Sequence, residues 1–313
     1  MMEVNMNVDA VINDHLINLE LCTWSEKDIP MQERGVSLNW LINYVKSIYD
    51  LHNEPIRKGY FEKIRQYEQY EYQKKAANHF SHVPDPEYMP YPSEPNLFEL
   101  TTRQFVSSYV VPQTKSIKAP LYARVPKSER GKPTLFISHA WDAKIRSVIP
   151  LTGWQKSEGT GTLDTLSKTN FIWIDFVCYN QHKLNDKRIA FDMESLIKSI
   201  GNVLFALTPV PLFNRIWCLW ELLSVSQLNS EIRFGTPQRM HFTDYKMWIN
   251  KYFESRTSVS DAKSTNPSDY EKIIKAIRSH FGSTYQADKY ITQLMLNAWD
   301  DFIYPHVKKL YNR

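Results

Sequence analysis

The chain has 313 residues, of which 42% are hydrophobic, 23% charged and 13% aromatic, with 38 basic against 34 acidic side chains. This composition is typical of a soluble globular protein of one large or two moderate domains, and the near-neutral charge argues against a nucleic-acid partner. Three scattered cysteines make no disulfide framework, no apolar run is long enough to span a membrane, and the N-terminus lacks a signal-peptide pattern. We therefore expect a cytoplasmic protein without a membrane partner.

Residues 1–82 are expected to form a helical N-terminal extension. The segment SLNWLINYVKSIYDLH carries apolar residues at helical spacing after Ser37, which is a suitable N-cap. Pro55 interrupts the pattern, and a second helix-forming segment follows it. The sequence thus predicts a helical hairpin that packs on the main domain. The whole of residues 1 to about 125 is expected to control association or access to the site rather than to contribute chemistry.

A proline-rich linker comes next. The stretch VPDPEYMPYPSEP contains five prolines, which neither a helix nor a central strand tolerates. Together with one short helix expected within LTTRQFVSSYVVPQTKS, this linker covers residues 83–125.

Residues 126–313 are expected to form an α/β domain. The short apolar runs PTLFISHAW, NFIWIDF and NVLFALTPV predict buried strands, and QRMHFTD is a further candidate. Helical segments lie between and after them, among them RIWCLWELLSVSQL with Asn214 as a suitable N-cap. Strands that alternate with helices predict a parallel sheet flanked by helices, and ligands of such sheets bind at the carboxyl ends of the strands.

Polar and aromatic side chains collect at those predicted ends. Each has a simple structural explanation, since Ser and Asp cap turns and Trp fills cores, but three separate segments supply them to one edge. We therefore predict that this edge binds the ligand. The residues concerned are Ser138, His139, Trp141, Asp175, Asn180, Arg215, Trp217 and Glu221.

Glu221 raises a question of its own, because it lies one turn after Trp217 in an otherwise apolar helix. An advance of about 100° per residue places the two side chains nearly one above the other. Such a carboxyl group is either an edge residue that reaches water or an acid held beside an aromatic ring for chemistry.

A metal site fits the sequence poorly. Cys178 and His182 have C-x3-H spacing, and His139 and Cys218 could complete a tetrahedral zinc site, but paired C-x2-C spacing is absent. The chain also lacks a Walker loop and a G-x-G-x-x-G fingerprint. We expect no metal, and the spacing does not decide whether a Cys–His nucleophile is present.

Three motifs resemble the boxes of a TIR-like domain. They are LFISHAW, WIDFVCYNQH and RIWCLWELL, in this order from Leu135 to Leu223. The third is similar to the W-C-L-x-E-L box of plant-type TIR domains, and the fuller S-H-A-W, W-I-D with N-Q-H and R-x-W-C-L-W-E pattern resembles a TIR-like subgroup of large microbial and protist proteins. The resemblance implies a flavodoxin-like parallel sheet, and it does not extend to residues 1–95.

Enzymatic members of that family cleave the nicotinamide–ribose bond of NAD+ and release ADP-ribose or a cyclic or conjugated form. The resemblance implies that Glu221 is the catalytic acid and that Ser138, His139 and Trp141 border the nucleotide. Some TIR hydrolases have a further Glu five residues after Asp175, where this chain has Asn180. NAD+ is then the substrate rather than a cofactor, and a homo-oligomer acting in immune or stress signalling is expected.

Two alternatives stay open. Many TIR-like proteins are non-catalytic modules that signal by oligomerising. A nucleoside-processing transferase on the same kind of sheet would also place a Glu against ribose.

Overall fold

The structure is a computed structural model that describes residues 29–79, 89–90, 92, 99–149, 171–183, 189–206, 212–228, 231–235, 258–264 and 267–298. The chain divides into two compact units. One comprises Met1–Val45 and Leu100–Arg313, and the other comprises Lys46–Glu99. These divisions differ from the expected boundaries after residues 82 and 125.

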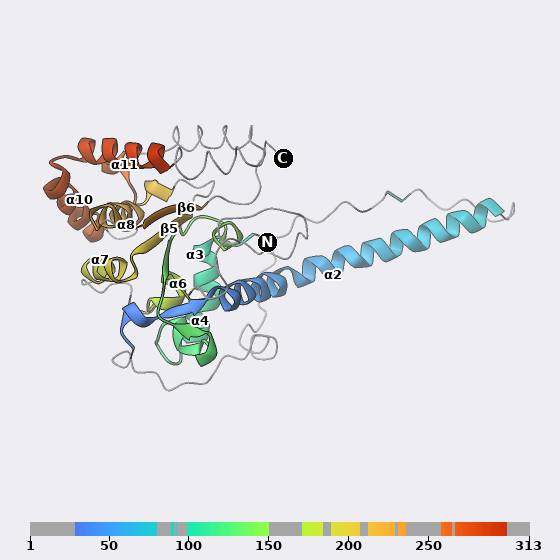
Figure 1. The fold of residues 1–313 in the computed structure, drawn as a ribbon. Coiled ribbons are helices and arrows are strands. Elements are labelled where there is room, and N and C mark those ends of the chain that lie inside the picture. Colours follow the sequence, from blue (N-terminus) through green and yellow to red (C-terminus); the bar gives the residue numbers. More distant parts are fainter. Residues whose placement is uncertain are drawn as a thin grey trace, which may run out of the picture. The chain divides into compact units, whose positions relative to one another are not determined.

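A six-stranded sheet forms the centre of the first unit, in the order β2-β1-β4-β3-β5-β6 (Figure 1). β3 pairs in parallel with β4 and β5, and β5 pairs in parallel with β6, whereas β1 is antiparallel to both β2 and β4. The expected α/β fold with a largely parallel sheet is confirmed. The strands are β1 (Gly35–Ser37), β2 (Arg130–Gly131), β3 (Leu135–Ser138), β4 (Phe171–Ile174), β5 (Asn202–Ala206) and β6 (Glu231–Gly235).

The three apolar runs predicted as strands are β3, β4 and β5. Almost all of their residues are buried, because a parallel strand between helical layers meets apolar neighbours on both faces. β6 is the fourth parallel strand and was not predicted, while QRMHFTD lies outside the described residues.

β1 corrects the expectation that the N-terminal extension is purely helical. Its residues belong to the same sheet as the strands of the α/β domain, through pairs such as Val36 with Ile172. A chain beginning near Ser128 would therefore lose a strand of the sheet, so truncation there does not remove a separate accessory arm. Whether the extension controls access to the site stays a prediction.

Gly35 allows β1 to lie close to its neighbours. A Cβ atom there would come within 2.6 Å of Gly131 O and 2.8 Å of Pro133 N, and backbone atoms do not swing aside as the end of a side chain does. We expect Gly35→Ala to lower the free energy of unfolding in urea by about 1–3 kcal/mol. An unchanged stability would show that β1 is not held against β2 in this way.

Gly59 provides the matched control. It lies inside a helix, and a Cβ atom there meets nothing within 4 Å. Gly59→Ala should therefore favour the helix by about 0.5–1 kcal/mol, the opposite sign to Gly35→Ala.

The first long helix, α2 (Leu38–His79), begins as predicted but does not break where predicted. Trp40 N donates a hydrogen bond to Ser37 Oγ over 3.1 Å, which confirms the N-cap. The expected hairpin is wrong, because the helix continues through Pro55. Proline lacks a backbone N–H, so the helix continues at the cost of one backbone hydrogen bond.

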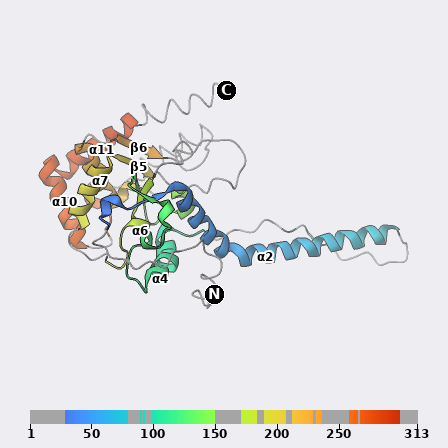
Figure 2. The same cartoon turned by 60° about the horizontal axis from the view of Figure 1, so that its bottom comes forward.

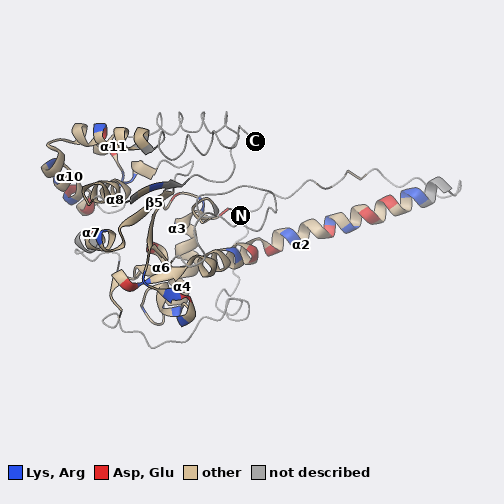
Figure 3. Ribbon diagram, in the orientation of Figure 1, with Lys and Arg blue, Asp and Glu red and all other residues tan. Residues whose placement is uncertain are grey.

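Within the second unit, the helix buries Ile48, Tyr49 and Tyr70, but most of its side chains are polar. Figure 3 shows acidic and basic residues alternating along it. Three ion pairs connect these charges, and such pairs support a helix that has no single apolar face. They are Arg57–Asp50, Lys58–Glu54 and Arg65–Glu62.

Helices cover both faces of the sheet in the first unit. α7 and α8 lie on one side, and α3, α4 and α6 on the other (Figures 1 and 2). Across the second side, the ring of Phe105 contacts those of Tyr44 and Phe176 edge to face. The helices are α3 (Thr102–Phe105), the π-helical turn Val106–Val110, α4 (Val111–Thr114), α5 (Ile145–Val148), α6 (Asp175–Cys178), α7 (Ile189–Ile200), α8 (Ile216–Gln227), α10 (Pro267–Phe281) and α11 (Thr284–Ala298).

These helices confirm the predicted short helix after the linker and the two helices near the C-terminus. The N-cap of α8 is Arg215, not Asn214 as expected, and its side chain makes no capping hydrogen bond. Within the part of the chain that the structure describes, no helix combines the length and the apolar character needed to cross a membrane.

Candidate functional site

The carboxyl ends of β3, β4 and β5 bring the predicted site residues to one edge of the sheet. Ser138 is the last residue of β3 and pairs with Phe205 of β5, while Asp175 directly follows β4. α8 follows β5 along the chain and carries Glu221. The order of pairing, not the order of sequence, makes these segments neighbours.

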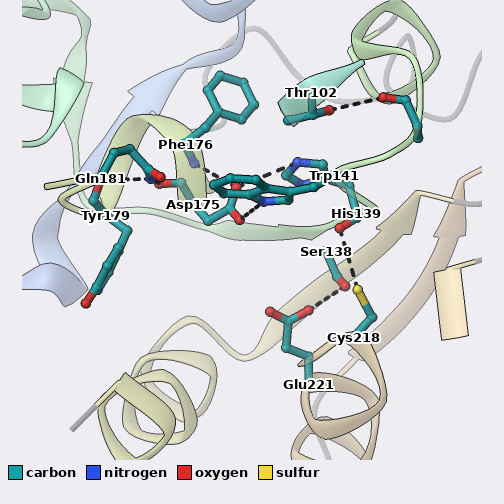
Figure 4. A network of polar contacts seen from close by, with 11 residues as sticks. Thr102, Ser138, His139, Trp141, Asp175, Phe176, Tyr179, Gln181, Cys218 and Glu221 are labelled. Carbon is teal, nitrogen blue, oxygen red and sulfur yellow. Dashed lines mark hydrogen bonds and ion pairs between the residues drawn. The ribbon is translucent and has the colours of Figure 1, made fainter. Parts of the chain in front are cut away.

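A hydrogen bond joins Ser138 to Glu221 (Figure 4). Ser138 Oγ donates to Glu221 Oε2 over 2.5 Å, although the two residues are 83 positions apart. Both are buried, with 1% of Ser138 and 9% of Glu221 exposed. Cys218 Sγ donates to His139 O over 3.5 Å, and this second contact fastens the same turn of α8 to the end of β3.

The environment of Glu221 favours its neutral form. Burial raises the pKa of this carboxyl to about 8; the negative charge of Asp175 also raises it, while the Ser138 hydrogen bond and the positive charge of Arg215 lower it. A carboxyl group of this kind is not a water-seeking edge residue. A cationic ligand beside it would favour its ionised form, and acids with perturbed pKa values are common at functional sites.

Asp175 holds a second group of side chains next to this pair (Figure 4). Trp141 Nε1 donates to Asp175 Oδ2 over 2.6 Å, and Phe176 N donates to Asp175 Oδ1 over 2.7 Å. His139 Nε2 lies 3.7 Å from Asp175 Oδ1. Burial lowers the pKa of His139 in spite of the nearby carboxylate, so the ring is neutral near pH 7 and this contact is not a full ion pair.

Asp142 is flanked by two arginines. Arg103 Nε donates to Asp142 Oδ1 over 2.9 Å, and Arg215 Nη1 lies 3.6 Å from Asp142 Oδ2. Burial acts to raise the pKa of Asp142, but the Arg103 hydrogen bond and the charges of Arg103, Arg215 and Lys263 outweigh it and lower the pKa. The guanidinium carbon of Arg103 also lies 5.8 Å from the centre of the Trp141 ring.

Arg103 was not predicted as a site residue. It belongs to α3, in the segment expected to be a linker with a short helix, and it reaches the site because Arg103 N donates to Trp141 O over 2.8 Å. The sequence signal in this segment is the capping box of Thr101 and Gln104, which predicts a helix start and says nothing of the partner strand.

Asn180 supports the loop after α6. Its Nδ2 donates to Lys118 O over 2.8 Å, and its Oδ1 accepts a hydrogen bond from His182 N over 3.0 Å. The residue is 3% exposed. Both ends of its amide are thus used within the protein, and the predicted contact of Asn180 with substrate stays a prediction.

The variant Asn180→Ala distinguishes a structural role of this amide from a role in substrate binding. Removing the amide leaves Lys118 O and His182 N without these bonds, so we expect a loss of about 1–3 kcal/mol in unfolding free energy. Asn297→Ala, at an exposed position of α11, is the control and should change stability little. A stable Asn180→Ala protein with a raised KM for its substrate would instead assign the amide to ligand binding.

Trp217 is half-buried on the first turn of α8. Among the described residues, no hydrogen bond or ion pair connects it to the Ser138–Glu221 pair or to the Asp175 group. Its predicted contact with substrate therefore stays a prediction.

The four residues weighed as zinc ligands have other contacts. Cys178 Sγ donates to Ile172 O over 3.9 Å, and Cys218 contacts His139 O as described above. His182 Nε2 lies 2.9 Å from Thr114 Oγ1. Across the described residues, no group of three or more His, Cys, Asp or Glu side chains is placed to hold a metal ion.

Comparisons with protein-family models, with characterised proteins and with solved structures find no match for this chain. Function is therefore inferred from the residues and geometry above. The feature that carries most information is a buried Glu held by a Ser from a neighbouring strand, with an aromatic and cationic group beside it.

Proposed function

We propose that the chain is a TIR-like NAD+ nucleosidase on a flavodoxin-like sheet. The order of the parallel strands supports this fold. Numbered along the chain, β4, β3, β5 and β6 lie in the order 2-1-3-4, which is the beginning of the flavodoxin-like order 2-1-3-4-5. In that arrangement the ligand binds where the strand order reverses, which here is between β3 and β5.

The observation that carries the proposal is the Ser138–Glu221 hydrogen bond. Ser138 ends β3, and Glu221 belongs to the helix that follows β5, so the pair spans the reversal point. A carboxyl group with a raised pKa at this point is well placed to meet a ligand that develops positive charge.

NAD+ cleavage provides such a charge. As the bond between ribose C1′ and the nicotinamide nitrogen breaks, its electron pair leaves with neutral nicotinamide, and the ribose becomes an oxocarbenium ion. Water then adds to C1′ and yields ADP-ribose and a proton. An ionised Glu221 would stabilise the cationic ribose, and the cationic ring of bound NAD+ would lower the pKa of Glu221 toward ionisation.

The Asp175 group fits a role in binding. The hydrogen bond from Trp141 to Asp175 fixes the plane of a half-buried indole ring at the same edge of the sheet as Glu221. A fixed aromatic plane is suited to stack on nicotinamide or adenine. We include in the proposal a homo-oligomeric, cytoplasmic enzyme of immune or stress signalling, with no nucleic-acid or membrane partner.

The experiment is to incubate the purified chain with NAD+ and to measure released nicotinamide. Release that depends on Glu221 supports the proposal, and its absence at high protein concentration favours the non-catalytic oligomerising module. Supplying a deoxynucleoside with a second free base tests the alternative of a nucleoside-processing transferase. Base exchange without NAD+ cleavage would favour that transferase over the NAD+ nucleosidase.

A further inference from the structure

The Asp142 cluster, which comprises Asp142, Arg103, Arg215 and Lys263, lies at the same edge of the sheet but takes no part in the chemistry above. Its three cationic members come from three separate segments, and Asp142 lies in a fourth, just after β3. Arg103 belongs to α3, Arg215 directly precedes α8, and Lys263 forms a β-bridge with Arg215. The backbone bonds Lys263 N to Asn214 O, at 2.7 Å, and Ile216 N to Lys263 O, at 3.1 Å, hold the last two segments together.

The charges of the cluster do not balance. Three cationic side chains act on one carboxylate, and their combined effect lowers the pKa of Asp142. Asp142 contacts Arg103 closely but is 3.6 Å from Arg215, which is longer than a hydrogen bond. A net positive charge thus remains at this point.

Arg215 connects the cluster to Glu221. Only 17% of its side chain is exposed, and its positive charge lowers the pKa values of both Glu221 and His139. Among the described residues its guanidinium makes no hydrogen bond. A largely buried guanidinium with unused donors is expensive to desolvate unless an anion completes its contacts.

We propose that the Asp142 cluster is the subsite for the diphosphate of the substrate. This inference rests on the proposed function and names the substrate class: a nucleotide with a diphosphate bridge, not a free nucleoside. Arginine forks match phosphate oxygens in bidentate geometry, and the net positive charge suits a group with one negative charge on each phosphate. Asp142 holds Arg103 in position and also weakens anion binding, so removing its charge should strengthen that binding.

The test is binding of ADP-ribose, compared with adenosine, to the full chain by calorimetry. We expect wild-type protein to bind ADP-ribose at least about tenfold more tightly than adenosine. Arg103→Gln should weaken ADP-ribose binding about tenfold and leave adenosine unchanged. Asp142→Asn should instead tighten ADP-ribose binding. Lys263→Gln, at an exposed position, should weaken it, while Lys272→Gln on α10 is the charge-matched control and should have no effect.

Opposite shifts for Arg103→Gln and Asp142→Asn are the decisive result, because loss of a purely structural ion pair would shift both variants in the same direction. Equal binding of ADP-ribose and adenosine, or binding of neither, would overturn the subsite. Turnover measurements distinguish failure of the subsite proposal from failure of the proposed function. If nicotinamide riboside were cleaved as efficiently as NAD+, the subsite proposal would be wrong and the nucleosidase proposal would stand. If ADP-ribose bound but no nicotinamide were released, the subsite proposal would stand and the nucleosidase proposal would be wrong.

Discussion

Glu221→Gln is expected to lower the rate of nicotinamide release from NAD+ by about 10² to 10³, with NAD+ binding largely retained. The amide keeps the size of the side chain and can still accept a hydrogen bond from Ser138, so the packing of α8 against β3 is preserved. The variant lacks the negative charge that faces the ribose as it becomes cationic, and loss of one well-placed electrostatic contact has an effect of this size. Single-turnover rates and KM values for NAD+ measure the two effects separately.

Trp220→Phe is the control for packing on the same helix. Trp220 is half-buried beside Glu221 in sequence, and shortening its ring should change stability more than turnover. Glu221→Gln protein that turns over NAD+ at the wild-type rate would show that the carboxylate is not the catalytic group.

The stability of the protein should fall with rising pH because of Glu221, and Glu221→Gln should abolish that part of the loss. The folded-state pKa is about 8 against an ordinary value of 4.5, so the folded protein binds the proton more tightly than the unfolded chain does. The resulting stabilisation is fully present below pH 4.5, declines as the pH rises, and is lost once the pH passes about 8. Glu221→Gln should therefore be the more stable protein at pH 8.5 by a few kcal/mol, and similar to wild type at pH 4.5.

Urea denaturation of the two proteins at pH 4.5 and 8.5 measures this difference. Glu271→Gln, which removes an exposed carboxylate of α10, is the control and should leave the difference between the two pH values as in wild type. A Glu221→Gln protein that is less stable than wild type at both pH values would mean that the carboxylate makes favourable structural contacts. In that case Glu221 is a structural acid of α8.

These two predictions are linked, because a buried acid whose ionisation lowers stability is a candidate for a functional group. Burial of Glu221 beside Asp175 opposes ionisation, and Arg215 and Ser138 offset this only in part. Under the proposed function, the site would lower stability in exchange for activity. We therefore expect Glu221→Gln to show both an increased free energy of unfolding at pH 8.5 and a loss of NAD+ turnover.

The sequence by itself determined the central strands and the helix that carries Glu221. The runs LFIS, FIWI and NVLFA are short, apolar and rich in β-formers, so they are strands wherever a sheet can bury both of their faces. The rule that ligands bind at carboxyl ends of parallel strands then named Ser138, Asp175 and Glu221 as neighbours before any contact was known. Local pattern also placed Ser37 as the cap of α2.

Other features depended on pairing between distant segments. β1 has three residues, Gly-Val-Ser, with no alternation to detect, and it is a strand only because β2 and β4 lie on either side of it. Pro55 suggested a break, but the helix continues because the turns on both sides form regardless of one missing hydrogen bond. Arg103 reaches Asp142 across 39 residues, a distance over which sequence periodicity carries no information.

The burial of the Glu221 carboxyl group is the clearest example of a feature that only the tertiary structure decided. The sequence left open whether its carboxyl group reaches water or is held inside, because helical spacing fixes the direction of a side chain relative to its own helix and not what lies opposite. Only the packing of α8 against the end of β3 places Ser138 there, 83 residues away, and leaves Glu221 9% exposed. That burial, which raises the pKa of the carboxyl to about 8, is a property of the assembled sheet edge and not of the α8 sequence alone.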